Sequence, residues 1–240
     1  MADARSRLLE RLIDHAPMFP PAQLPLDEAL ADHEAARASD AAWLLNRFVV
    51  RASALDLVPE TFATPLSIVA DTEWALDPRI AAIELPRPDD LEPLVGAAPE
   101  VYVEVAPDAD LGPLKENGLR AKIRCGGARV PAPSEVAAFI RECRRLRLQF
   151  KATAGLHAAV RRPGAHGFLN VLAAAVFGDE ERALTDEDAT AFSLTPEAFS
   201  WRGEKASADE VAAARRDLFV SIGSCSFFEP VEELQTLGIL

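Results

Sequence analysis

The chain lacks most of the features that mark secreted, membrane-spanning or nucleic-acid-binding proteins. Its 240 residues include three cysteines, none spaced as in a C-x-x-C metal motif. No apolar run is long enough for a membrane span, and residues 1–5 lack the basic and then apolar pattern of a signal peptide. Lysine and arginine number 25 against 38 acidic residues, for a net charge of −13. We therefore expect a cytoplasmic protein whose main partner is neither a membrane nor a nucleic acid.

Two local features stand out against these absences. A basic run falls on a predicted helix, where a solvated face is the favoured interpretation; it consists of Arg141, Arg144, Arg145 and Arg147. Cys125 and Cys225 lie in predicted glycine turns, whereas Cys143 is predicted to be buried in that same helix. A reactive thiol is conceivable in either turn, but packing as small residues is the interpretation that we favour.

What the sequence does contain is an alternation of short apolar runs with helix-like segments. The runs have strand length and end at Gly, Pro, Asp or Ser; they cover residues 44–50, 66–70, 80–85, 101–105, 119–123, 149–154 and 218–225. Helices are predicted over residues 133–146, 168–177 and 229–237, and a hairpin over 192–201. Strands alternating with helical connections predict a parallel sheet. Because some connections are too short for a full helix, we favour an α/β fold of the (β/α) TIM-barrel type, with irregular connections, over an open doubly wound sheet.

No shift in composition marks a domain boundary, so we expect a single barrel domain over residues 1–240. Residues 1–40 are predicted to form a helical N-terminal extension, with one amphipathic helix over 5–15 and a second over 26–37. Such an extension could cover an interface between copies of the chain, and the sequence leaves a homo-oligomer open.

The predicted strand ends are unusually rich in charge, and in parallel barrels active-site groups collect at the C-terminal strand ends. Glu84 and Glu104 each interrupt an apolar run. Lys122 and Lys151 follow on the next two strands, each with a glycine four residues later. An unpaired buried charge costs several kcal/mol, so four such residues at consecutive strand ends predict a shared polar pocket. Like charges brought close lower each other's pKa, and a lysine so affected can act as a nucleophile or base.

Other candidates are positioned by the same strand ends. Alternation along a strand places Arg124 on the face of Lys122, and Thr153 on the face of Lys151. The loop that follows holds two of the four histidines, which can shuttle protons near neutral pH. A glycine turn with hydroxyl residues at 223–226 could present N–H groups to a phosphate. The predicted catalytic residues are Lys122, Lys151, Glu104, Glu84 and His157, and the predicted substrate-binding residues are Arg124, Thr153, His166, Gly223, Ser224 and Ser226.

Three of these segments, in this order, resemble the deoxyribose-phosphate aldolase family. They are the two Lys-x-x-x-Gly segments at 122–126 and 151–155 and the Gly-Ser-x-Ser turn at 223–226, and the resemblance covers about a third of the chain. It implies a (β/α) barrel that needs no cofactor and joins or splits carbon–carbon bonds through an imine on Lys122, with Lys151 lowering the pKa of that lysine. Glu84 or Glu104 would relay the proton. The sequence departs from the family at Ile-Arg-Cys after Lys122 and at Leu-His after Gly155.

We therefore predict a lyase of aldolase type that acts on a small carbonyl substrate, which could be phosphorylated. One alternative is a Mg²⁺-assisted enolising enzyme, in which Asp71, Glu84 and Glu104 would supply the oxygen ligands. A second alternative is a non-catalytic barrel that binds a small anion or a protein partner, with the apolar opening around Met18 and Phe19 as its interaction arm.

Overall fold

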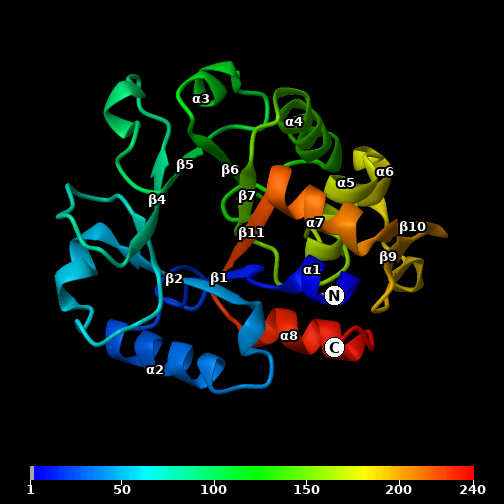
Figure 1. The fold of residues 1–240 in the computed structure, drawn as a ribbon, viewed down its shortest axis with the longest axis horizontal. Helices are drawn as coiled ribbons and strands as arrows, with labels where there is room; N and C mark the ends of the chain where they lie inside the picture. Colours follow the sequence, from blue (N-terminus) through cyan, green and yellow to red (C-terminus); the bar gives the residue numbers. More distant parts are fainter. Residues whose placement is uncertain (1–2) are drawn as a thin grey trace.

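The computed structural model describes residues 3–240, and its centre is a closed barrel of eight parallel strands (Figure 1). In the order in which they pair around the barrel, the strands are β1 (Ile13–His15), β11 (Phe219–Ser224), β7 (Phe150–Thr153), β6 (Arg120–Arg124), β5 (Glu100–Glu104), β4 (Ile80–Pro86), β3 (Leu66–Val69) and β2 (Leu45–Arg51). All seven apolar runs thus became barrel strands. The predicted (β/α) barrel is confirmed.

Helices cover the two sides of the barrel unequally. The connections from β2 to β6 hold only short 3-10 helices and the five-residue α3 (Gly112–Glu116). The connection from β3 to β4, which the sequence predicted to be too short for a full helix, holds none. The helices α4 (Pro133–Leu146), α5 (Phe168–Phe177), α7 (Ala208–Asp217) and α8 (Phe228–Thr236) lie on the side of β6, β7 and β11, and the short α6 (Glu180–Thr185) packs against α4 and α5 (Figure 1). The helix α2 (Leu26–Arg37) instead packs against the side of β2 and β3. In α4, Pro133 stands in the first turn and Glu135 accepts the N–H of Ala132 at 2.7 Å, as a helix start prefers.

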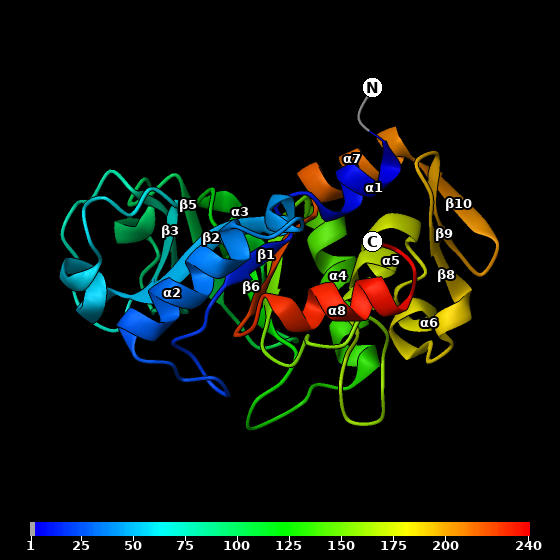
Figure 2. The same ribbon diagram turned by 90° about the horizontal axis from the view of Figure 1, so that it is seen from below.

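The N-terminal extension is not wholly helical, which corrects the prediction for residues 5–15. The first helix, α1 (Ala4–Leu9), is shorter than expected and packs against α7 (Figure 2). Residues Ile13–His15 instead form β1, which pairs with β11 and β2 and closes the barrel. The apolar residues of 5–15 were predicted to form one face of a single helix. Some of them belong to β1 instead.

A small antiparallel sheet lies outside the barrel, between α6 and α7 in the chain. It contains β8 (Phe192–Leu194), β9 (Ala198–Trp201) and β10 (Glu204–Ser207), so the predicted hairpin has a third strand. Asp186 fixes the sheet, because it accepts the indole N–H of Trp201 at 2.8 Å and pairs with Arg202 at 2.6 Å.

The apolar core lies between the strands and the helices, and the barrel interior is largely polar. Outward-facing strand residues such as Ile123, Phe150 and Ala152 are buried under the helices. A second apolar cluster around Phe48 and Ile68 lies against α2. Within residues 3–240, no helix is both long and apolar enough to cross a membrane.

Candidate active site

Two neighbouring strands bring Lys122 and Lys151 to the same level of the barrel. In the parallel pair β6–β7, the two residues are register partners. Ile123 and Ala152, the next residues along each strand, are buried in the core outside the barrel, so the two lysines point inward. The sequence prediction that the lysines share one interior is therefore confirmed by the pairing.

Lys151 is fully buried and has a carboxylate on each side. Its ammonium group contacts Asp14 on β1 and donates to Oε1 of Glu84 on β4 at 2.7 Å. Asp14 in turn accepts from the hydroxyl of Ser221 at 2.8 Å and from the amide of Asn46 at 2.7 Å. Burial alone would lower the pKa of Lys151, but Asp14 and Glu84 outweigh it and raise the pKa above its ordinary value. Lys151 is therefore held as a cation.

Glu84 connects the two lysines through its two oxygens. Oε1 accepts from Lys151 and from the hydroxyl of Ser67 at 2.7 Å, while Oε2 accepts from Lys122 at 3.1 Å. Burial raises the pKa of this carboxyl, but the ammonium groups of Lys151 and Lys122 hold it well below its usual range. Glu84 thus stays ionised and separates two like charges that would otherwise repel each other.

Lys122 lies nearer to solvent and between two glutamates. Its Nζ is 3.1 Å from Glu84 and 3.0 Å from Glu104, and Arg124 approaches Glu104 at 3.9 Å. Side-chain exposure rises along this series, from 7% for Lys122 to 27% for Glu104 and 51% for Arg124. The charged residues therefore lead from a closed interior to the mouth of the barrel, and the immediate partners of Lys122 are carboxylates.

A second charged layer, which was not predicted from the sequence, lies toward the N-terminal ends of the strands. Glu100 at the start of β5 accepts from Arg47 at 2.5 Å and from the Tyr102 hydroxyl at 2.6 Å, and pairs with Arg120 at 2.5 Å. Burial and the neighbouring Glu100 raise the pKa of Tyr102, so its hydroxyl keeps its proton. Arg47 also lies 3.8 Å from Asp14, which joins this layer to the lysine site.

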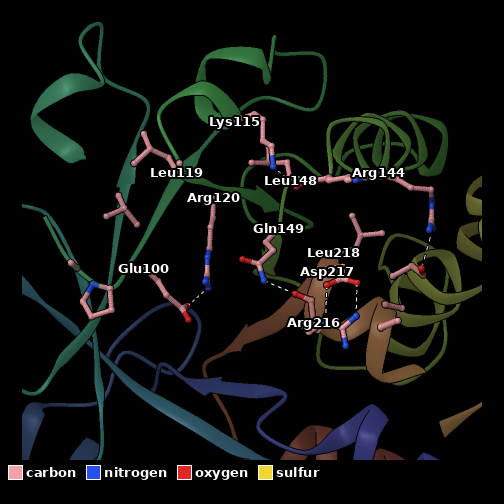
Figure 3. Close-up of a pocket in the computed structure, with 18 of the residues that line it drawn as sticks. Glu100, Lys115, Leu119, Arg120, Arg144, Leu148, Gln149, Arg216, Asp217 and Leu218 are labelled. Carbon is pink, nitrogen blue, oxygen red and sulfur yellow. Dashed lines mark hydrogen bonds and ion pairs between the residues drawn. The ribbon is translucent and has the colours of Figure 1, made fainter. Parts of the chain in front are cut away.

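A large cavity of about 990 Å³ opens at this N-terminal end of the barrel, opposite the predicted active-site face (Figure 3). Its lining includes Glu100 and Arg120 at the starts of β5 and β6, and Gln149 just before β7. Much of its polar lining is already paired, for example Arg120 with Glu100 and Arg216 with Asp217 at 2.7 Å. In barrels of this kind the N-terminal face serves stability rather than chemistry.

The predicted turn at 223–226 begins later than expected, because Gly223 and Ser224 are the last residues of β11 and only Cys225 and Ser226 follow the strand. Gly223 is required there, because a Cβ at this position would come within 2.9 Å of Cγ2 of Thr153. The hydroxyl of Ser224 donates to the carbonyl of Ser226 at 2.6 Å, and that of Ser226 accepts the N–H of Glu229 at 3.2 Å. Both hydroxyls are thus engaged in shaping the turn and the start of α8.

The two histidines predicted as site residues contact groups other than the two lysines. His166 is buried, and its Nε2 lies 2.8 Å from the carbonyl oxygen of Pro131. His157 is half-buried in the loop after β7, where its ring contacts Cys225 and Glu229. Neither ring has a recorded contact with Lys122 or Lys151 within the described chain.

The three carboxylates proposed as Mg²⁺ ligands do not come together. Asp71 accepts from the backbone N–H and the hydroxyl of Ser53, at 2.9 and 2.6 Å, and both oxygens of Glu84 are taken by lysines. Across residues 3–240, no group of three or more His, Cys, Asp or Glu side chains is arranged to hold a metal ion.

The residues that sequence reasoning missed are those that surround Lys151. Asp14 lies in a strand of three residues that was interpreted as part of a helix. Ser67 and Ser221 are buried hydroxyl residues inside apolar runs, where they donate to Glu84 and Asp14, and Asn46 stands beside Arg47 in its run. A polar residue at an inward strand position is the one signal that could have found them.

Comparisons with known proteins identify this fold. No protein-family model matches the chain, and no curated protein matches it in sequence. Among solved structures, the chain is similar to the deoxyribose phosphate aldolase from Aeropyrum pernix, which is described as having a unique tetrameric structure. The match covers 98% of both chains, with a TM-score of 0.50 and 15% sequence identity. At this identity the likeness shows a shared barrel fold, which confirms in fold the resemblance suggested by the lysine segments.

Proposed function

We propose that the chain is an enzyme of aldolase or lyase type, which acts on a small carbonyl compound through an imine on Lys122. The observation that carries the proposal is the different setting of the two lysines. Lys151 is enclosed between Asp14 and Glu84 as a permanent cation, whereas Lys122 lies on the side of the mouth, 3.0 Å from the partly exposed Glu104.

Imine formation requires Lys122 to lose a proton, and Glu104 is placed to take it. The uncharged amine would then attack the carbonyl carbon, forming a C–N bond and leaving a hydroxyl on that carbon. Glu104 returns its proton to the hydroxyl, water departs, and a positively charged iminium remains. As the bond between the α and β carbons of the substrate breaks, its electron pair moves into the iminium to give an enamine, and the β-hydroxyl gives its proton to the ionised Glu104 and becomes a carbonyl. Glu104 thus acts as both base and acid in the proposed cycle.

The other charges of the site would favour this path. Glu84 balances the Lys151 charge and, being ionised, can share the positive charge of the iminium. Imine chemistry of this kind uses protein side chains alone.

Further features of the proposal follow from the resemblance. A phosphorylated substrate would place its phosphate at the turn with Gly223, Ser224 and Ser226, and Arg124, 51% exposed at the mouth, could contact it. Because the similar aldolase structure is a tetramer, we also propose that this chain forms a homo-oligomer, and that it acts in the cytoplasm. The enolising alternative has less support, since its carboxylates are already engaged.

Borohydride trapping tests the imine directly. The chain would be incubated with small aldehydes and ketones, with and without a phosphate group, reduced with borohydride and mapped by peptide mass spectrometry. The sequence has only four lysines, Lys115, Lys122, Lys151 and Lys205, so each adduct is assigned without ambiguity. We expect the adduct on Lys122.

Two variants serve as controls for the trapping. Lys122→Ala should abolish both the adduct and carbon–carbon cleavage, whereas Lys115→Ala should leave both unchanged, because Lys115 donates to the carbonyl of Arg147 on the opposite end of the barrel. Full turnover by a folded Lys122→Ala variant, checked by circular dichroism, would refute the proposal.

A further inference from the structure

A second cluster of reactive groups lies at the C-terminal end of the barrel, apart from the lysines. Cys225 follows β11, His157 lies in the loop after β7, and Glu229 is in the first turn of α8. Sγ of Cys225 is 3.9 Å from Nε2 of His157, and Nδ1 of the same ring is 2.7 Å from Glu229. A nucleophile, a base and a carboxylate are thus neighbours at this end of the barrel.

Glu229 lies beside Nδ1 of His157, although this contact does not have the geometry of a hydrogen bond. In the tautomer with its hydrogen on Nδ1, the neutral ring would leave Nε2 free to accept the S–H of Cys225. The contact with Cys225 and the charge of Glu229 raise the pKa of His157 against the opposing effect of burial. The ring is therefore a stronger base than an ordinary histidine.

Neighbouring charges do not disturb this arrangement. Glu233, one turn further along α8, accepts the N–H of Ala159 at 3.1 Å and pairs with Arg162 at 2.6 Å. The negative charge of Glu233 is therefore balanced by Arg162 and the backbone of this loop. Glu229 remains the carboxylate that faces the His157 ring.

The other two cysteines provide a contrast within the same chain. Cys125 and Cys143 are fully buried, and burial raises the pKa of the Cys125 thiol to about 12 and raises that of Cys143 as well. Neither has a recorded histidine contact among the described residues. Cys225 is 8% exposed, beside a His157 side chain that is 30% exposed. Packing as a small residue, the role predicted for Cys225, does not account for its contact with His157.

We propose that Cys225, His157 and Glu229 form a reactive thiol site, at which hydrogen peroxide or a similarly small peroxide oxidises Cys225 to a sulfenic acid. The small exposure of Cys225 restricts access to reagents of a few atoms, which favours a peroxide over a larger electrophile. The site uses none of the residues of the proposed imine chemistry.

The reaction balances with the peroxide as the oxidant. Nε2 of His157 takes the thiol proton while sulfur attacks the terminal peroxide oxygen. The S–O bond forms as the O–O bond breaks, and the imidazolium gives its proton to the departing oxygen. Sulfur is oxidised to S–OH, and the peroxide is reduced to water or an alcohol. An external thiol would reverse the oxidation through a mixed disulfide.

The test is sulfenic-acid labelling of the folded chain with dimedone at pH 7 after brief exposure to hydrogen peroxide, with mapping of all three cysteines. We expect the label on Cys225 and none on Cys125 or Cys143. The rate in His157→Gln should fall about 100-fold, because the general base is lost. Glu229→Gln should cause a smaller loss of about tenfold, since that carboxylate is largely exposed.

Glu232→Gln is the matched control, because it removes the same charge from an exposed position of the same helix and should leave the rate unchanged. Equal labelling of the three cysteines, or an unchanged rate in His157→Gln, would overturn the proposal. So would equal rates with hydrogen peroxide and the bulkier tert-butyl hydroperoxide. Trapping at Lys122 is measured separately, so failure of one proposal does not affect the other.

Discussion

The barrel interior contains two lysines at the same register, and their surroundings differ in one respect. The inner half of the charge network, around Lys151, is closed to solvent and complete, with Asp14, Glu84 and their hydroxyl partners. The outer half, around Lys122, opens through the partly exposed Glu104 to the mouth. The comparison teaches that burial and partners, not residue type or strand position, decide which lysine is structural and which can react.

Replacing each lysine by methionine should have the largest effect and should separate the two halves most clearly. Lys151→Met leaves the carboxylates of Asp14 and Glu84 buried without their cation, so we expect a loss of about 3–5 kcal/mol in the free energy of unfolding. Lys122→Met leaves Glu84 paired with Lys151 and Glu104 near solvent, so about 1–2 kcal/mol is expected. Urea unfolding followed by circular dichroism measures both.

The substitution is the same in both variants, so each serves as the control for the other. Equal losses would mean that the two halves are equally structural. In that case the assignment of Lys122 to chemistry would lose its physical basis.

Low pH should reduce the stability of the folded chain through protonation of Glu84 in the inner half of the charge network. The pKa of Glu84 is lower in the folded chain than in the unfolded chain, so its stabilisation is present above the unfolded value of about 4.3 and is lost as the pH falls below it. In Lys151→Met this acid loss should shrink most, because Lys151 lowers the pKa of Glu84 both by its charge and by a hydrogen bond. In Lys122→Met, which removes only the smaller effect of the Lys122 charge, more of the loss should remain. Urea midpoints between pH 3 and pH 7.5 test this.

A buried histidine pair should lower the free energy of unfolding at a milder pH than Glu84 does. Nδ1 of His15 is 3.1 Å from Nδ1 of His33, and burial lowers the two pKa values to about 3 and about 4. The unfolded chain takes up protons first, so stability should fall from about pH 6.5 downward, by up to about 1.4 kcal/mol per histidine and pH unit. His33→Gln should roughly halve the slope of this part of the curve, because His15 remains buried, and should leave the loss due to Glu84. A flat wild-type curve between pH 6.5 and pH 5 would contradict the role of the pair.

The sequence could predict both lysines and both glutamates of the site, but not Asp14, which completes the inner half. Glu84, Glu104 and the two lysines interrupt apolar strands, and the strands themselves were clear from their length and boundaries. Asp14 could not be found in this way, because its strand has three residues and continues an amphipathic pattern that favours a helix. Its contact with Lys151 also joins positions 137 residues apart, a separation that no local pattern encodes.

The same reason explains why Cys225 was interpreted as a packing residue. Its partner His157 is 68 residues away, and the barrel closure that brings β7 beside β11 is what places the two together. Composition and turn chemistry describe each residue by itself. The contact between Cys225 and His157 depends on which strands are neighbours in the barrel. The sequence predicts the class of fold but not this order of strands.

The smallest effect on stability, and the sharpest test of the comparison, is expected from Glu104→Gln. The side chain is 27% exposed and Lys122 keeps Glu84 as a partner, so the free energy of unfolding should change by less than about 1 kcal/mol. Imine trapping at Lys122 should nevertheless slow by about 100-fold, because the proposed acid and base is lost. Glu60→Gln, at an exposed position outside the barrel strands, is the matched control and should alter neither quantity. A large loss of stability with unchanged trapping would place Glu104 among the structural charges and move the boundary between the two halves outward, past Lys122.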